Sequence, residues 1–473
     1  MNIRFSIGVL AAVIAAPTIV FSQCVVPDFQ LPPDTAGEAT FSLNLDYPDD
    51  DGSFDRFTTT TDFRTDWQGY LNEVLAYAFE GNLENDFMVQ NNTVRGWYHT
   101  PWLHAGHSGR EYVHGLTRER TSPPRELQQD VNRFFQNWGI GFYNEAAGTQ
   151  LGKIWTDFCN PSMTALEGVN FPEGSVSFKV LFTEASESEI DALAGAPTWT
   201  AHIHPEGVRP GRDPEQTRPE VCDRTEDCPR ELRTVSLLQI DVAVKDARAG
   251  DTGWVFGTFV YDHREPGTDG WEKLRPISIG WGNDPSVMPG GTLQENRINA
   301  DFEGVFYGWA GREKLGWNGR ANGPVDNPQS SCVACHGSAQ YPRSDTFANI
   351  RPRDLVLTDI EMLRVYFRNI EAGELFDPDV VPRFPFSSDV VVPVSLDYSL
   401  QTQLGLEQLC FAWIDGVAPF ATGDPQPDIC PDSRSEGFSA LEVRTLSLPV
   451  EGRSMIERLL IDERDLPVSK DAD

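Results

Sequence analysis

The chain has 473 residues, of which 40% are hydrophobic, and a formal net charge of −33. That length suggests two or three compact units, and the hydrophobic share is sufficient for a sizeable core. The strong negative charge argues against binding to nucleic acid or to anionic lipid surfaces. It agrees with electrostatic steering of a basic protein partner at low salt, and equally with solubility in a salty medium.

Residues 1–22 have the pattern of a secretory signal peptide. Arg4 precedes an apolar run over residues 7–20, and we expect cleavage between Ser22 and Gln23. No later stretch approaches about 20 uninterrupted apolar residues, so we expect no transmembrane segment in the mature chain. Cys24 would suit a lipoprotein, but Gln23 is a poor residue before a lipidated cysteine. The sequence therefore predicts a periplasmic protein without a lipid anchor.

The region from residue 23 to residue 165 is predicted to be mixed and partly helical. It opens with an acidic, threonine-rich stretch. Apolar residues then recur at helical spacing between Thr61 and Phe79. A second predicted helix begins at Pro123 and Pro124, because proline fits the first turn, and its apolar stripe extends to Trp138.

From about residue 171 the apolar period changes from helical to two. Strands are predicted at residues 176–182, 198–204, 238–244, 254–260 and 276–281. Alternation with turn residues between the strands favours an antiparallel sheet packed on one face. Few helical segments lie between the strands, which argues against a doubly wound α/β fold.

The C-terminal region is predicted to be helical again. Thr358 and Glu361 match a capping box, T-x-x-E, and Gly373 suits the end of that helix. Another helix is predicted between Ser395 and Trp413. The expected fold class is α+β, with a β-rich region between mainly helical flanks. The expected boundaries are 1–22 for the signal peptide, 23–165 and 346–473 for the flanks, and 166–345 for the β-rich region.

The run from Cys332 to His336 is a C-x-x-C-H motif, which occurs once in the chain. This spacing is the attachment signature of c-type haem, because the two thiols reach one porphyrin edge and the next histidine can bind the iron. A redox C-x-x-C would accompany a βαβ pattern, and a zinc site would need a second C-x-x-C or a histidine pair, but neither is found. We therefore expect one covalent haem c on Cys332 and Cys335, with His336 as the proximal iron ligand.

The six other cysteines form an even remainder, which in an exported protein suggests disulfides. Two pairs each bracket a short segment, and the third pair is what is left over. These pairs are Cys222–Cys228, Cys410–Cys430 and Cys24–Cys159. Connectivity cannot be deduced from sequence alone, so other pairings stay open.

The order of several short segments resembles a group of β-sheet cytochromes. The segments are Phe171–Ser175, the strand that holds Lys179, Val242–Asp246, Gly253–Phe256 and Cys332–His336. They are similar to cytochrome c-prime-beta and to the hydroxylamine-oxidising cytochromes whose haem is crosslinked to a lysine. The resemblance covers roughly residues 166–345, and the long flanks depart from those small proteins. It supports the fold more than it supports an activity.

The resemblance implies that His336 is the proximal ligand and that the sheet covers the haem. In the crosslinked relatives a strand lysine bonds the porphyrin edge, and Lys179 is the nearest match unless it points to solvent. In the c-prime-beta relatives an apolar distal side leaves the iron open to nitric oxide or carbon monoxide. Phe178 and Phe182 would supply that lid, unless they are ordinary core residues.

Two methionines are candidates for the sixth iron ligand. Met288 lies in a proline- and glycine-rich loop, and Met362 lies on the predicted helix after the motif. Methionines are more often core or surface residues than ligands. Methionine ligation would raise the redox potential and favour plain electron transfer, whereas an open site would favour small-molecule binding or catalysis.

Histidines form a further candidate site. His99, His104, His107 and His114 lie in one short segment and could approach the distal haem face or bind another ion. Neighbouring glycines indicate a loop, and no regular ligand spacing occurs. Ordinary hydrogen-bonded histidines are therefore the competing interpretation.

A second histidine pair lies on a predicted strand. His202 and His204 would share one face of that strand, because side chains alternate, and Glu206 is close in sequence. Such a group would suit zinc or copper. A structural or solvent-facing role is the alternative.

Together these patterns predict an exported protein that transfers single electrons through one covalent haem c. Its expected partner is a redox protein, and the acidic charge favours a basic one. The alternative is a haem enzyme or gas-binding protein that acts on hydroxylamine or nitric oxide. A third hypothesis is a structural envelope protein that its haem stabilises.

Overall fold

The computed structural model describes residues 24–29, 39–50, 52–105, 109–128, 130–205, 209–210, 221–222, 230–287, 289–300, 315–341, 360–375, 393–421 and 424–430. Several predictions of the sequence fall on other residues. These are the signal peptide, His107, Glu206, Cys228, Met288 and Thr358. The following description concerns the described residues only.

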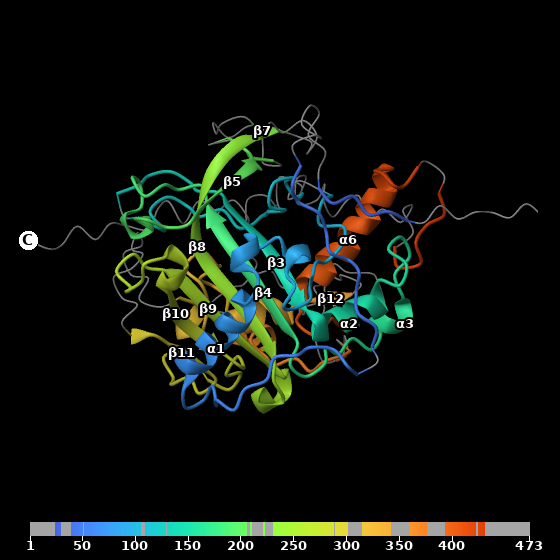
Figure 1. The fold of residues 1–473 in the computed structure, drawn as a ribbon. Helices are drawn as coiled ribbons and strands as arrows, with labels where there is room; N and C mark the ends of the chain where they lie inside the picture. Colours follow the sequence, from blue (N-terminus) through green and yellow to red (C-terminus); the bar gives the residue numbers. More distant parts are fainter. Residues whose placement is uncertain are drawn as a thin grey trace, which may run out of the picture.

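A nine-stranded antiparallel sheet forms the centre of the described chain (Figure 1). Its path is β1 (Trp97–Tyr98), β3 (Asn137–Asn144), β4 (Val176–Thr183), β8 (Glu231–Lys245), β9 (Trp254–Tyr261), β10 (Leu274–Gly280) and β11 (Asn296–Ile298). Off this path, β2 (Thr117–Arg118) pairs with β3, and β5 (Thr198–Ile203) pairs with β8. The five strands expected from alternation are confirmed as β4, β5, β8, β9 and β10. The sheet also uses strands on the N-terminal side of residue 166.

Two small sheets and several helices complete the described part. The small sheets pair β6 (Arg209–Pro210) with β7 (Val221–Cys222), and β12 (Gln340–Tyr341) with β13 (Val394–Ser395). The α-helices are α1 (Trp67–Phe79), α2 (Glu145–Ile154), α3 (Met163–Leu166), α4 (Cys332–Gly337), α5 (Ile360–Tyr366) and α6 (Leu400–Asp415). Short 3₁₀ helices occur at Leu83–Asn85, Val89–Asn91, Asp191–Leu193, Ala247–Thr252, Gly270–Lys273 and Trp317–Gly319. This combination confirms the expected α+β class.

None of the helices in the described part of the chain combines the length and apolar character that crossing a membrane requires. The longest, α6, has 16 residues. It begins at Leu400 rather than at the predicted Ser395, because Ser395 belongs to β13 and Asp397 and Tyr398 have positive φ values. A left-handed backbone at two successive residues cannot continue into a right-handed helix.

Helix α1 covers one face of the sheet. It begins where the Asp66 side chain accepts a hydrogen bond from the Gly69 amide at 3.0 Å. The buried residues of α1 pack against apolar side chains at every second position of the strands, because successive side chains of a strand point to opposite faces. The cluster includes Tyr70, Leu71, Val74, Ile140, Phe142, Phe178, Val180, Ile240, Val242, Val255 and Phe259. The pattern expected for this helix is thus confirmed, although it starts six residues later than Thr61.

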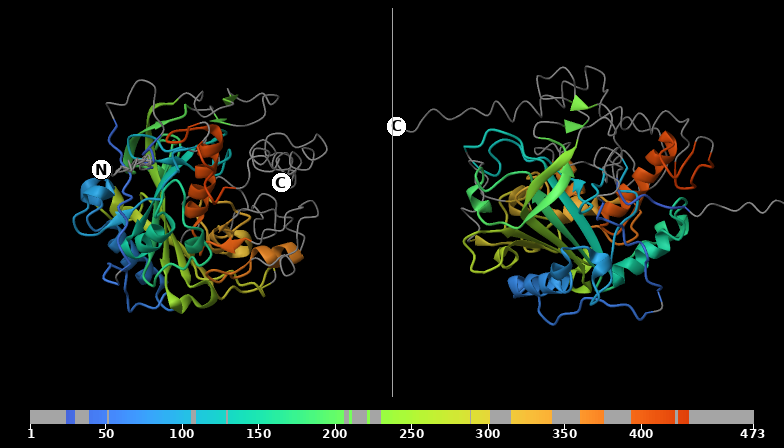
Figure 2. Two further views of the ribbon diagram at one scale, coloured as in Figure 1. Left: turned by 90° about the vertical axis from the view of Figure 1, so that its right-hand side faces the viewer. Right: turned by 45° about the horizontal axis from the view of Figure 1, so that its top comes forward.

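The C-terminal elements cover the opposite face. Figure 2 (left) shows α1 and the orange and red C-terminal elements on opposite sides of the sheet. A second hydrophobic cluster joins the sheet to these elements, and its members include Tyr143, Ala243, Trp254, Phe256, Val333, Tyr398, Leu406 and Leu409. The residues of C-x-x-C-H therefore lie on the face that α1 does not cover.

The helix predicted from Pro123 to Trp138 is wrong. Ser122 and Phe135 form an isolated antiparallel bridge, and Arg125 has a φ of 67° that a helix cannot accommodate. Phe135 packs in a third hydrophobic cluster, whereas Trp138 packs in the cluster under α1. The apolar residues therefore serve different parts of the core, and their helical spacing is a coincidence.

Two of the three expected disulfides are confirmed. Cys24 pairs with Cys159, and Cys410 pairs with Cys430. The third pair cannot be assessed, because Cys228 and the side chain of Cys222 lie outside the described part. Each confirmed pair ties an irregular segment to the second hydrophobic cluster.

Gly257 on β9 lets α1 approach the sheet closely, because a Cβ there would collide with the Leu71 side chain. We expect Gly257→Ala to lower the free energy of unfolding by about 1–3 kcal/mol, since the buried leucine must shift in a filled core. Urea unfolding measures this. Gly168→Ala is the matched control, because a Cβ at Gly168 meets nothing within 4 Å. Equal unfolding midpoints for the two variants would contradict the close approach.

Candidate functional site

The two thiols and the imidazole of C-x-x-C-H share one face of the short helix α4. Positions 332, 335 and 336 fall within about one-third of a helical turn, because a helix has about 3.6 residues per turn. Ser331 begins the helix, and its hydroxyl accepts a hydrogen bond from the Ala334 amide at 2.9 Å. The same hydroxyl donates to Asn283 at 2.8 Å, which fixes the start of α4 to the loop after β10.

Both thiols are unpaired and half-buried. Burial raises the pKa of Cys332 well above its ordinary value and that of Cys335 to about 12, and the Asp326 charge adds to both shifts. A redox-active C-x-x-C shows the opposite, a lowered thiol pKa. The described residues also hold no group of three or more His, Cys, Asp or Glu that could bind a metal ion. The thiols are therefore unlike a redox dithiol or a structural zinc site.

The imidazole of His336 is held in one tautomer. Its Nδ1 lies 3.0 Å from the carbonyl oxygen of Tyr398, so Nδ1 carries the proton and donates it. Burial lowers the pKa of His336 to about 4, and the nearby Lys179 charge adds to this against the opposing effect of the hydrogen bond. The ring is therefore neutral at pH 7, with the lone pair on Nε2. A metal-binding histidine commonly has this arrangement, with its other nitrogen bonded to a carbonyl or carboxylate.

A row of polar side chains crosses the sheet towards α4. Lys179 on β4, Asp241 on β8 and Thr258 on β9 are successive cross-strand neighbours. Lys179 Nζ lies 3.5 Å from Asp241 Oδ2, and Thr258 Oγ1 donates to Asp241 Oδ1 at 3.0 Å. Thr258 Oγ1 also lies 3.9 Å from the Sγ of Cys332. The row therefore connects the middle of the sheet to the first thiol.

Two further carboxylates join this row. Glu119 lies 3.6 Å from Lys179 Nζ. The Gln239 amide donates to Asp241 at 2.7 Å and to Asp326 at 3.2 Å, so one amide group holds two carboxylates close together. Burial, and next the Asp326 charge, raise the pKa of Asp241 to about 7 against the effect of Lys179. Burial alone would lower the pKa of Lys179, but these carboxylates raise it above its ordinary value.

One buried polar atom beside this row lacks a partner. Gln401 on α6 packs over Gly141, the cross-strand neighbour of Lys179, where any Cβ would collide with it. Its Oε1 is buried without a hydrogen-bond partner among the described residues. Leaving such an atom unpaired costs free energy, so it is open to a donor from outside the described residues. The two free thiols, which share one face of α4 and reach Thr258 on the sheet, fit a cofactor held between α4 and the sheet.

The lid expected from Phe178 and Phe182 is not formed at this site. Both side chains point to the opposite face from Lys179 and belong to the cluster under α1. Strand alternation dictates this, because odd and even positions of β4 face opposite sides. Instead, the Phe256 ring packs beside the imidazole, with ring centroids 5.0 Å apart.

Met362 lies on α5 and packs beside Ala334, Leu363 and Phe367. Ala334 is on the side of α4 turned away from the thiols and the imidazole. The geometry therefore does not bring Met362 to their face. Met288, the other candidate ligand, lies outside the described residues.

The described histidines of the histidine-rich segment do not gather at α4. Nδ1 of His99 accepts from the Asn44 amide at 2.9 Å, and its ring contacts Phe142 on the α1 side. The His114 ring stacks on Trp199 at 4.3 Å and lies 3.2 Å from Asp86. His104 is buried, and burial lowers its pKa to about 4. His104 has no hydrogen-bond partner among the described residues.

His202 and His204 also have structural surroundings. The His202 ring lies 4.9 Å from the Tyr112 ring, and the His204 ring lies 5.8 Å from the Trp138 ring. No third ligand accompanies them within the described chain. These contacts agree with the structural role that the sequence left open, and the zinc or copper alternative is not tested because Glu206 lies outside the described residues.

Sequence reasoning missed Asp241, Asp326 and Tyr398. The sequence does hold a clue to Asp241, because this charged residue shares a strand face with Gln239 within a mainly apolar stretch. Tyr398 had none, because it contributes a backbone carbonyl. Only the fold shows which carbonyl meets His336.

Comparisons with protein-family models, with curated proteins and with solved structures found no match. The resemblance to the β-sheet cytochromes therefore stays a prediction from the sequence. The case for the site depends on its own geometry.

Because the pKa of Asp241 is raised from 3.8 to about 7, ionising it costs the folded state free energy as pH rises from about 4 to 7. We expect the free energy of unfolding of Asp241→Asn, relative to that of the unmodified protein, to rise between pH 5 and pH 8 by at most about 3 kcal/mol, because about two pH units of this window lie below the pKa. Urea unfolding at both pH values measures this.

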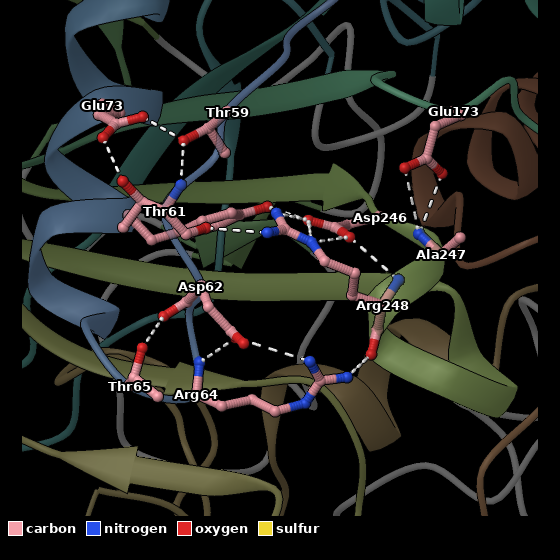
Figure 3. A network of polar contacts seen from close by, with 11 residues as sticks. Thr59, Thr61, Asp62, Arg64, Thr65, Glu73, Glu173, Asp246, Ala247 and Arg248 are labelled. Carbon is pink, nitrogen blue, oxygen red and sulfur yellow. Dashed lines mark hydrogen bonds and ion pairs between the residues drawn. The ribbon is translucent and has the colours of Figure 1, made fainter.

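Asp246→Asn is the matched control for this prediction. Asp246 forms short hydrogen bonds with Arg248 in the network of Figure 3, and these lower its pKa despite burial. Its stabilising effect is fully present above about pH 4 and is lost only at lower pH, so Asp246→Asn should lower the free energy of unfolding equally at pH 5 and pH 8. A stability difference for Asp241→Asn that is the same at pH 5 and pH 8 would contradict the raised pKa.

Proposed function

We propose that this protein is a monohaem c-type cytochrome that transfers single electrons. One observation carries the proposal: two unpaired thiols and a neutral imidazole with a free Nε2 share one face of α4. A dithiol enzyme or a zinc site would require other pKa values or more ligands. A haem attachment site requires this trio at this spacing.

Each residue of the trio would have a separate role. Cys332 and Cys335 would each add their S–H across a vinyl group, so that sulfur bonds one carbon and hydrogen the next. His336 would bind the iron through Nε2, while the Tyr398 carbonyl keeps the Nδ1 proton in place. The bound haem would supply the change between ferric and ferrous iron.

The electron would come from a reduced protein and leave to an oxidised one. The net charge of −33 favours partners with a basic surface. Disulfides Cys24–Cys159 and Cys410–Cys430 support an oxidising compartment such as the periplasm. The first of them also uses the sulfur that a lipid anchor at Cys24 would need.

We expect Cys335→Ser to lose one covalent link to haem and to give less holoprotein from a host with a cytochrome c maturation system. Acidic acetone extraction and the mass of the intact protein measure attachment. The control is the double variant Cys410→Ser/Cys430→Ser, which should lose stability by about 2–4 kcal/mol and keep its haem. Colourless unmodified protein from that host would overturn the proposal.

A second candidate is a haem enzyme or gas-binding protein that acts on hydroxylamine or nitric oxide. The ionisable row beside the thiols favours it, because chemistry on such molecules moves protons as well as electrons. Asp241 can exchange a proton near neutral pH, and Lys179 lies between it and Glu119. Bonding Lys179 to a porphyrin edge would replace one N–H and one C–H, and would require an oxidant such as a peroxide.

Carbon monoxide distinguishes the two candidates. If the iron is open, the absorption spectrum of the ferrous protein shifts promptly when the gas is added. An unchanged spectrum contradicts the enzyme and gas-binding candidate. Mass spectrometry of the haem peptide tests the crosslink in parallel. A crosslink would add the mass of the Lys179 peptide to the haem peptide, and Lys179→Arg should abolish that added mass.

A further inference from the structure

The segment that holds the Tyr398 carbonyl has an unusual backbone. Asp397 and Tyr398 both have positive φ values, 47° and 68°. Residues with side chains rarely adopt this conformation, and it persists only where surrounding contacts hold it. Asp397 is fully buried, with an exposed fraction of 0%. The contacts of its carboxylate therefore matter for the position of Tyr398.

The Asp397 carboxylate is bound by three groups from the sheet and its approach. Lys245, the last residue of β8, places Nζ 2.7 Å from Oδ1 and 2.8 Å from Oδ2. Trp254, the first residue of β9, donates its indole N–H to Oδ1 at 2.8 Å. The Phe171 amide donates to Oδ2 at 2.7 Å. The carboxylate thus ties the segment before α6 to the ends of two adjacent strands.

Tyr398 is fixed on its other side as well. Its hydroxyl accepts from the Ile370 amide at 3.0 Å and donates to the Ile370 carbonyl at 3.0 Å. Its ring packs 5.7 Å from the ring of Phe256, which in turn lies against His336. With both sides held, the Tyr398 carbonyl points at Nδ1 of His336.

We propose that Asp397 is a positioning residue for the iron ligand: its buried ion pair with Lys245 holds the strained segment that aims the Tyr398 carbonyl at His336. This inference rests on the proposed function, because it concerns how the imidazole binds iron. The hydrogen bond at Nδ1 makes the imidazole a stronger electron donor. A stronger donor stabilises ferric iron and so lowers the redox potential.

A buried ion pair alone would not identify such a role. Asp246 forms a comparable network with Arg248 and Tyr70, and Figure 3 shows it joining the turn after β8 to the segment before α1. That network leads to the α1 side of the sheet. The Asp246 carboxylate therefore provides a control with similar chemistry whose side-chain contacts lead away from His336.

The test uses the haem-loaded full-length protein with Asp397→Asn. We expect a higher midpoint potential, and a lower iron–histidine stretching frequency in the resonance Raman spectrum of the ferrous protein. Asp397→Glu should restore part of both shifts. Asp246→Asn should lose stability but leave the potential and the frequency unchanged.

Trp254→Phe is the milder variant if Asp397→Asn does not fold. It removes one donor to Asp397 and keeps an aromatic ring in the core, so the same shifts should appear at smaller size. Haem-loaded Asp397→Asn or Trp254→Phe with an unaltered potential and stretching frequency would overturn the positioning role. Absence of haem from the unmodified protein would instead overturn the proposed function.

Discussion

The alternation of side chains along β4, β8 and β9 is the constraint on which the rest of the structure depends. Phe178, Val180 and Val242 point to the α1 side, while Lys179, Asp241 and Thr258 point to the side of α4. A register slip of one residue would bury the charges under α1 and expose the aromatic core. The same pairing that builds the core therefore also places the ionisable row beside the thiols.

Polar contacts as well as the second hydrophobic cluster attach the site to the sheet. Asn283 receives the hydrogen bond of Ser331, and Asp397 binds the strand ends at Lys245 and Trp254. A buried ion pair is weak support for stability, because desolvation offsets most of the attraction. We explain the ion pair of Asp397 with Lys245 by geometry instead: it holds the segment whose Tyr398 carbonyl meets Nδ1 of His336. Rigid support of this kind is what a metal ligand requires.

Sequence patterns predicted the strands well and the site in part. The strands β4, β8 and β9 have clear alternation, but the first two residues of β3 were assigned to a helix and the rest of that strand was not predicted. Its sequence also alternates, with Trp138, Ile140 and Phe142 on the core side, but the intervening Gly139 and Gly141 weaken the strand signal. The thiols and His336 were visible as a motif. Asp326 is close to the motif in sequence, but Thr258 and Tyr398 are more than 60 residues away, and their approach depends on sheet register and on a backbone carbonyl.

The ionisable row is the part of the site that simple electron transfer does not explain. A carrier needs a held cofactor and a partner surface, and neither requires three carboxylates around one lysine. Burying such groups costs free energy, and strongly shifted pKa values of this kind gather at functional sites. A purely structural ion network would be expected to stabilise the charged form of Asp241. Its surroundings instead raise the pKa of Asp241 to about 7. Asp241, whose pKa is raised to about 7, is separated from the Cys332 thiol by the Thr258 hydroxyl alone, and this placement is the observation behind the second candidate function.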